Sequence, residues 1–180
     1  MAQQTADFEL IATAMHGNCV FSDAQHPANI QHLPGQAVVS VAENSTGTVH
    51  FPLGIMVDTG SVNVNSDSNY KPGLWLQVDC SQVEAQGGYG EPKCTEVVKA
   101  EVFIGCQLVW AKDFSIAKAD PPKTQTFREF LGLEYIYQAC MADGPKGLEV
   151  TLTLKYGRDS MRFCSVEVFE VVPRNTSQTR

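Results

Sequence analysis

The side chains best suited to proton transfer in this sequence are its four histidines, because an imidazole changes charge near neutral pH. His50 lies inside an alternating apolar segment, so a strand would turn it onto the face opposite its apolar neighbours. There it is a candidate proton donor or base. His16 follows an apolar segment and is a second candidate, with a turn residue that bonds backbone as the alternative. His26 and His32 lie in a polar stretch and are interpreted as surface residues.

Other signatures of chemistry are missing from the sequence. No two histidines have the H-x-H spacing with which a strand could hold a metal, so we predict neither a metal site nor a cofactor. The G-x-S-x-G, P-loop and G-x-G-x-x-G patterns are also absent. A Ser-His-Asp triad is therefore not supported, and no motif names a reaction.

Aromatic side chains in strand-like segments form a second group of candidates. They either fill the core, since aromatic residues dominate core burial, or hold a flat or ring-shaped apolar molecule. Trp75 and Gln77 alternate with Leu74 and Leu76, which favours a binding face. The predicted substrate-binding residues are Trp75, Trp110, Tyr135 and Tyr137, and the predicted catalytic residues are His16, His50 and Arg128.

Six cysteines, none in a C-x-x-C pair, favour disulfides over a zinc or thioredoxin-like site. Cys80 and Cys94 flank a Gly-rich polar segment, where a disulfide would stabilise the fold by about 3 kcal/mol through loop closure. The alternative is six buried free thiols, which behave as small apolar side chains. The other pairs that we expect are Cys19 with Cys164 and Cys106 with Cys140.

Two N-x-S/T triplets, at Asn44 and Asn175, lie in polar stretches and are candidate glycosylation sites. Together with the cysteines they favour a protein of the secretory pathway or the extracellular space. The first residues show no basic and apolar leader, so a cytoplasmic protein is the open alternative.

Alternation with a period of two residues dominates the chain. In residues 147–156, Leu148, Val150 and Leu152 alternate with Glu149 and Thr151, a pattern typical of a half-buried antiparallel strand. We expect the first and last strands to pair or neighbour each other. Similar segments are residues 8–15, 36–42, 48–57, 61–65, 73–80, 97–104, 107–114, 133–137 and 162–172.

Helix signals are few. Residues 96–103 are rich in β-branched and aromatic side chains, which favour a strand, and residues 124–131 are the best candidate for one short helix. Turn residues such as Pro34-Gly35 separate the segments. We therefore predict one all-β domain over residues 1–180, an antiparallel β-sandwich of jelly-roll type with at most one short helix.

The amino-acid composition argues against two classes of partner, nucleic acids and membranes. The 180 residues carry 20 acidic and 13 basic side chains, a net charge of -7, which disfavours binding to nucleic acid. No apolar run has the roughly 18 residues of a membrane helix, so no membrane partner is expected. We expect a small apolar or ring-shaped molecule as the partner, with a homo-oligomer as a further option.

Three short blocks resemble a family of small all-β proteins of unknown function. Its members carry Met-His-Gly-Asn near the N-terminus, as residues 15–18 do here, and a strand with His-Phe-Pro, as in residues 48–53. Residues 166–170 are similar to its last strand. The six cysteines and the longer middle section depart from the pattern. The resemblance implies an all-β fold, marks His16, Asn18 and His50, and supplies no activity.

Three functions fit these observations. The first is a cofactor-independent cyclase or isomerase of specialised metabolism, which would use an apolar pocket and a few hydrogen bonds to promote pericyclic, Diels-Alder-like chemistry. The second is a carbohydrate-binding, lectin-like module. The third is a secreted structural or interaction protein. Pocket shape discriminates them, because a deep apolar cavity favours the first and a shallow surface groove the second.

Overall fold

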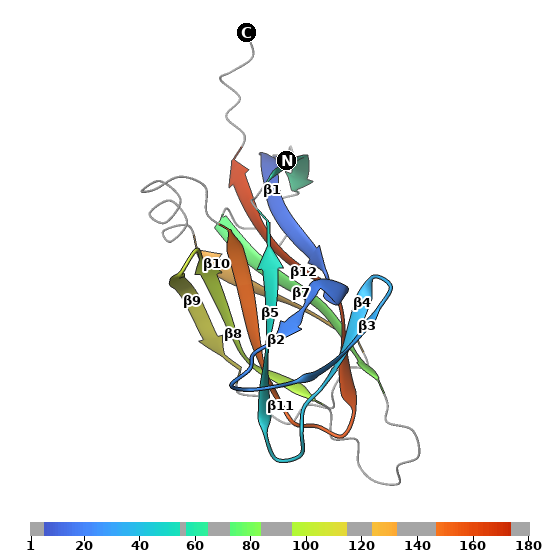
Figure 1. Cartoon of the computed structure of the whole chain (residues 1–180). Helices are drawn as coiled ribbons and strands as arrows, with labels where there is room; N and C mark the ends of the chain where they lie inside the picture. Colours follow the sequence, from blue (N-terminus) through green and yellow to red (C-terminus); the bar gives the residue numbers. More distant parts are fainter. Residues whose placement is uncertain are drawn as a thin grey trace.

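Most of the residues that the structure describes lie in β-strands. The computed structural model describes residues 6–54, 57–64, 73–83, 95–114, 124–132 and 147–173. Within these ranges it contains twelve strands and one 3-10 turn, η1 (Gly17–Cys19), and no α-helix. Two antiparallel sheets pack as a sandwich (Figure 1), which confirms the predicted all-β sandwich. Nowhere in the described ranges is there a helix with the length and hydropathy to cross a membrane.

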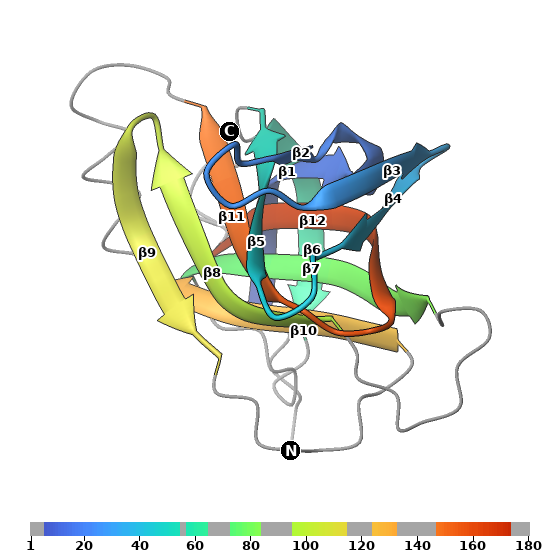
Figure 2. The ribbon, with the colours of Figure 1, turned by 60° about the horizontal axis from the view of Figure 1, so that its bottom comes forward.

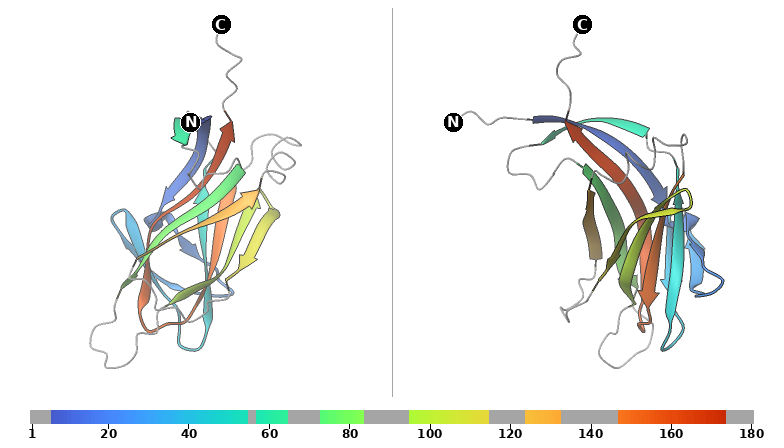
Figure 3. Two further views of the ribbon diagram at one scale, coloured as in Figure 1. Left: turned by 180° about the vertical axis from the view of Figure 1, so that it is seen from behind. Right: turned by 90° about the vertical axis from the view of Figure 1, so that its left-hand side faces the viewer.

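The larger sheet, called the large sheet below, has seven strands. Its main path runs β10-β7-β12-β1-β6, and β4 continues from β12 with β3 beside it. The strands are β10 (Thr124–Gly132), β7 (Gly73–Val83), β12 (Ser160–Pro173), β1 (Ala6–His16), β6 (Val57–Val64), β4 (Gln36–Ser40) and β3 (Asn29–Leu33). As predicted, the first and last strands pair, and β1 and β12 lie side by side in Figure 3.

The second sheet, called the small sheet below, has five strands in the order β2-β5-β11-β8-β9. They are β2 (Phe21–Ser22), β5 (Thr46–Leu53), β11 (Leu148–Lys155), β8 (Glu96–Ile104) and β9 (Gln107–Asp113). Figure 2 shows this sheet stacked over the strands of the large sheet. The predicted strand over residues 96–103 is confirmed as β8.

The core lies between the two sheets and follows the predicted alternation. On β11, Val150, Leu152 and Leu154 are each 0% exposed, while Glu149 and Thr153 point away from the interior and are half-buried. Burying each such aliphatic side chain stabilises the fold by about 1.5–3 kcal/mol. The result is a small sheet with one apolar face and one polar face, and the polar face carries the candidate site.

One predicted element is wrong. Residues 124–131 form strand β10 rather than a short helix, and Phe127 pairs with Val78 of β7. Phe127 is half-buried and Leu131 is buried, whereas Arg128 is exposed, so the segment has a strand period. Pairing with the edge of β7 decides the conformation, because β-propensity depends on such cross-strand packing.

The hairpin of β3 and β4 lies in the polar stretch that contains His32. Strand β3 was not among the predicted segments, and it pairs with β4 from Asn29 to Leu33. Its turn is Pro34-Gly35, the predicted separator, and Gly35 has φ +71°, a left-handed conformation that glycine adopts without strain.

Three cysteines are exposed free thiols: Cys19, Cys106 and Cys164. The predicted Cys19–Cys164 disulfide is therefore wrong. Cys19 lies in η1, where its Sγ donates to Asn18 Oδ1 at 3.5 Å. Cys164 lies where β12 changes its neighbour, pairing with β4 through Phe163 and with β1 from Ser165 onward.

The other two predicted disulfides involve residues outside the described ranges. Cys106 lies in the turn between β8 and β9, and its free thiol contradicts the bond predicted to Cys140. Cys80 is a buried thiol, 2% exposed on β7, so the predicted Cys80–Cys94 bond is not formed in the structure either.

The predicted glycosylation site Asn44 is exposed in the turn between β4 and β5, with φ +59°. The turn is closed by Ser45, whose backbone N–H donates to the Ala42 carbonyl at 3.1 Å. The other predicted site, Asn175, lies outside the described residues.

Candidate functional site

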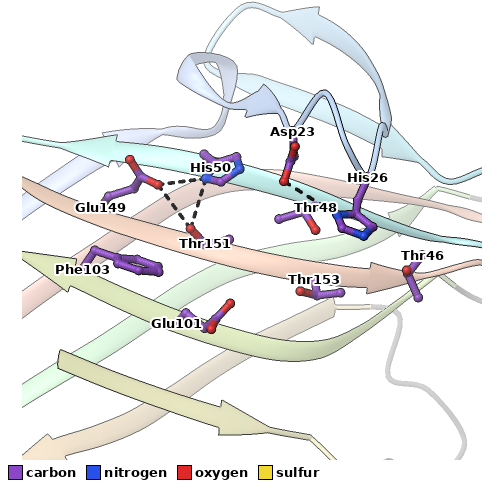
Figure 4. Close-up of a pocket in the computed structure, with 10 residues that line it drawn as sticks. All are labelled: Asp23, His26, Thr46, Thr48, His50, Glu101, Phe103, Glu149, Thr151 and Thr153. Carbon is purple, nitrogen blue, oxygen red and sulfur yellow. Dashed lines mark hydrogen bonds and ion pairs between the residues drawn. The ribbon is translucent and has the colours of Figure 1, made fainter. Parts of the chain in front are cut away.

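A hollow of about 370 Å³ lies on the polar face of the small sheet, turned away from the core (Figure 4). It is called the groove below. Nine of its ten lining residues carry a hydroxyl, carboxylate or imidazole, and the tenth is a phenylalanine. The lining residues are Asp23, His26, Thr46, Thr48, His50, Glu101, Phe103, Glu149, Thr151 and Thr153.

Strand register explains why the floor of the groove is polar. His50 of β5 pairs with Thr151 of β11, and Thr151 pairs with Glu101 of β8, so these three side chains form one row across the sheet. Alternate residues along each strand share a face, which adds Glu149 and Thr153 to the same surface. These are the polar positions of strands whose other residues fill the core.

The wall of the groove is the segment between β2 and β3. It is held against the edge of β5 by two backbone hydrogen bonds, in which Asp23 N–H donates to the Thr48 carbonyl at 3.0 Å and Thr48 N–H donates to the His26 carbonyl at 2.8 Å. Gln25 N–H also donates to Asp23 Oδ1 at 2.6 Å, which tightens the turn. These contacts hold Asp23 and His26 at the side of a sheet face that is otherwise open.

His50 is the most constrained side chain of the groove. Its Nδ1 lies 2.8 Å from Glu149 Oε1 and 3.1 Å from Thr151 Oγ1, and the Thr151 hydroxyl donates to Glu149 Oε1 at 3.3 Å. Phe21 stacks on the imidazole, with ring centroids 5.0 Å apart and planes 13° apart. The His50 side chain is 19% exposed, so the ring is partly accessible.

Acidic groups outnumber basic ones along the lining, which contains three carboxylates and neither lysine nor arginine. The backbone N–H of Gln25 lowers the pKa of Asp23, and the nearby imidazoles of His26 and His50 lower it further. Glu101 is paired with Lys99, which lies outside the lining, at 2.7 Å. Asp23 is therefore ionised at neutral pH and gives the wall a negative charge.

The structure separates the catalytic residues predicted from the sequence. His50 lies in the groove. His16 is exposed at the end of β1, opposite Ser165 of β12, and Arg128 lies on β10, where its Nε donates to Gln77 Oε1 at 2.5 Å. Both belong to the large sheet, so they do not join His50 in one site.

The predicted aromatic residues do not line the groove either. Trp75 of the large sheet contacts Phe130, with ring centroids 5.1 Å apart. Trp110 of β9 is packed against the core. Tyr135 and Tyr137 lie outside the described residues. The aromatic rings at the groove are those of Phe21, which stacks on His50 and was not predicted, and of Phe103, one of the aromatic residues noted in the strand-like segments.

The remaining residues of the groove were not predicted as site residues, because no motif in the sequence marks them. Glu149, Thr151 and Thr153 were predicted to face away from the core, which was correct, but nothing in the sequence placed β11 beside β5. In the ranges that the structure describes, no group of three or more His, Cys, Asp or Glu side chains is placed to hold a metal ion.

A scan against protein-family models, a search of curated proteins and a search of solved structures each found no match. The resemblance to the Met-His-Gly-Asn family therefore stays a prediction.

Proposed function

We propose that the protein binds a small polyhydroxylated ligand of the carbohydrate class in the groove. The observation that carries this proposal is the lining, in which nine of ten side chains are polar and form a hollow on an outer sheet face. A site for a small molecule combines a concave surface with a few convergent polar groups. The groove has both features.

The polar groups of the groove match a sugar ring in hydrogen-bonding capacity. Each threonine hydroxyl donates one hydrogen bond and accepts others, as a sugar hydroxyl does, and the carboxylates accept only. Thr46 and Thr48 of β5 and Thr153 of β11 lie on two adjacent strands of the floor. Side chains on adjacent strands can bind hydroxyls on neighbouring ring carbons of one sugar at the same time.

Two aromatic rings supply the apolar part of the site. Phe103 is half-buried in the lining, and Phe21, which stacks on His50, is 48% exposed. An aromatic face packs against the C–H face of a sugar ring while the hydroxyls point to the floor. Lectin domains are found among β-sandwiches of the jelly-roll type, the topology that we expect for this chain.

The cyclase function predicted from the sequence is less well supported than carbohydrate binding. Pericyclic catalysis by shape requires a largely apolar site that encloses the substrate. The groove is instead open on the sheet surface, and nine of its ten lining residues carry a polar group. A purely structural or interaction role, the third expectation, would leave the groove without a ligand.

The test is a titration followed by ¹H–¹⁵N NMR with glucose, galactose, mannose and N-acetylglucosamine, each added up to about 50 mM to detect millimolar dissociation constants. We expect chemical shift changes at residues of β5 and β11 for at least one sugar. Thr48→Val and Thr153→Val should weaken binding about 5- to 10-fold, since each removes one hydrogen bond worth about 1 kcal/mol.

Ser165→Ala is the matched control, because it removes a hydroxyl from the large sheet, where Ser165 donates to Asp79 Oδ2 at 3.0 Å. It should leave binding unchanged. If none of the sugars shifts any groove resonance, or if Thr48→Val and Thr153→Val bind as tightly as the natural protein, the proposal is wrong.

A further inference from the structure

We propose that His50 is a general base that interconverts the two anomers of a reducing sugar bound in the groove. This inference rests on the proposed function, since it requires a sugar at this site, and it adds a catalytic activity to binding.

The contact with Glu149 fixes which ring nitrogen carries the proton. A carboxylate can only accept, so the 2.8 Å contact between His50 Nδ1 and Glu149 Oε1 requires a proton on Nδ1. In the neutral ring the lone pair is then on Nε2. Thr151 Oγ1, at 3.1 Å from Nδ1, lies on the same side and leaves Nε2 as the available nitrogen.

The ring is held in place on two sides. Phe21 stacks against its face at 5.0 Å, and Glu149 and Thr151 hold the Nδ1 edge. A base whose orientation is fixed by a third group is the arrangement that proton-transfer catalysis uses. Its side chain remains 19% exposed, which allows a ligand in the groove to reach it.

Anomer exchange is a reaction that one oriented base and water can perform. His50 Nε2 takes the proton from the anomeric hydroxyl, and the oxygen electron pair forms the carbonyl at C1. The bond from C1 to the ring oxygen breaks, and that oxygen takes a proton from water, leaving hydroxide. After rotation about the bond from C1 to C2, the reverse transfers close the ring, so that hydroxide and imidazolium both return to their starting states.

Glu149 acts as a positioning residue in this step. It holds the Nδ1–H bond, and its negative charge stabilises the imidazolium that forms while the sugar is open. Glu149→Gln keeps an oxygen acceptor and removes the charge. It should lower kcat about 10-fold or more and change KM by less than about twofold, because the ligand contacts remain.

The experiment measures the approach to anomeric equilibrium of freshly dissolved α-glucose by polarimetry, using the full chain in a non-nucleophilic buffer. The natural protein should accelerate this approach. His50→Gln should lower the protein-dependent rate about 10²- to 10⁴-fold, which is the usual contribution of a general base. Added imidazole should partly restore the rate of His50→Ala. His32→Gln is the control, because His32 is exposed on β3 and its Nδ1 contacts the Asn18 carbonyl.

Methyl α-glucoside separates this inference from the binding proposal, since it cannot open its ring. If it binds in the NMR titration while glucose equilibrates no faster with the protein than without it, the inference is wrong and the binding proposal stands. Equal rates for the natural protein and a folded His50→Gln variant also overturn the inference. If none of the sugars in the titration binds, both proposals fail.

Discussion

Gly17 lies so close to the backbone of Phe163 that a Cβ atom on residue 17 would stand 1.9 Å from the Phe163 carbonyl oxygen. The turn η1 therefore crosses β12 at a point where only glycine fits. This contact leads the chain out of β1 in the large sheet and toward β2 in the small one, beside which the wall of the groove lies.

Replacing this glycine should destabilise the fold. Gly17→Ala forces backbone to move, because the clash involves a carbonyl rather than a flexible side chain, and should lower the free energy of unfolding by at least about 1–3 kcal/mol. Urea denaturation measures the change. Gly147→Ala is the control, since a Cβ there meets nothing within 4 Å, and equal stability of the two variants would contradict the prediction.

Truncating a buried leucine of the core should lower the free energy of unfolding more than truncating an exposed leucine. Leu152 is 0% exposed on β11, so Leu152→Ala should lower the free energy of unfolding by about 2–5 kcal/mol. Leu108 on β9 is 47% exposed, and Leu108→Ala should change it by less than about 0.5 kcal/mol. Thermal denaturation of both variants measures the contrast, and similar melting temperatures would argue against the described packing.

The stability of the protein should depend on Glu170 in a direction set by burial. Desolvation raises the pKa of Glu170, which is 8% exposed, so its ionised form opposes folding at neutral pH. Glu170→Gln should therefore stabilise the protein at pH 7. The gain should shrink as the pH falls through the raised pKa and vanish below 4.5, the ordinary value for this group.

Denaturation midpoints measured from pH 7 down to acid conditions give this profile. Glu43→Gln, at an exposed position between β4 and β5, is the control. Its midpoint should stay close to that of the natural protein at every pH. A Glu170→Gln variant that is less stable at pH 7 than the natural protein would show that the carboxylate is favourably paired.

Alkylation should divide the cysteines into two groups. Cys19, Cys106 and Cys164 are exposed and should react quickly with iodoacetamide at pH 8. Burial raises the pKa of Cys80 to about 12, with smaller contributions from Asp79 and Cys164, so little reactive thiolate forms there.

Mass spectrometry of the native, the denatured, and the denatured and reduced protein distinguishes the outcomes. We expect Cys80 to be labelled only after denaturation. A requirement for reductant as well would contradict this expectation and indicate a disulfide at Cys80. If Cys19 and Cys164 resist labelling until reductant is added, they are bonded after all.

The sequence predicted which side of each strand faces the core better than it predicted which strands lie next to each other. It correctly turned His50 away from Val49 and Phe51, which are both 0% exposed, because alternation within one strand is a local property. It could not show that His50 would contact Glu149, since the two residues are 99 positions apart and strand order is set by packing of the whole chain. The same limit explains why the groove wall at Asp23 was missed.

The pairing of β1 with β12 constrains when the protein can fold. Phe8 pairs with Val62 of β6 on one side and with Pro173 of β12 on the other, so the first described strand finds its second partner only after the whole intervening chain has been synthesised. Contacts between such distant segments must overcome a large loop-closure entropy, which slows folding. During translation the edge of β1 that faces β12 therefore keeps unpaired backbone groups, even after β6 has been made, and its protection from other chains in that interval depends on the cell rather than on its own fold.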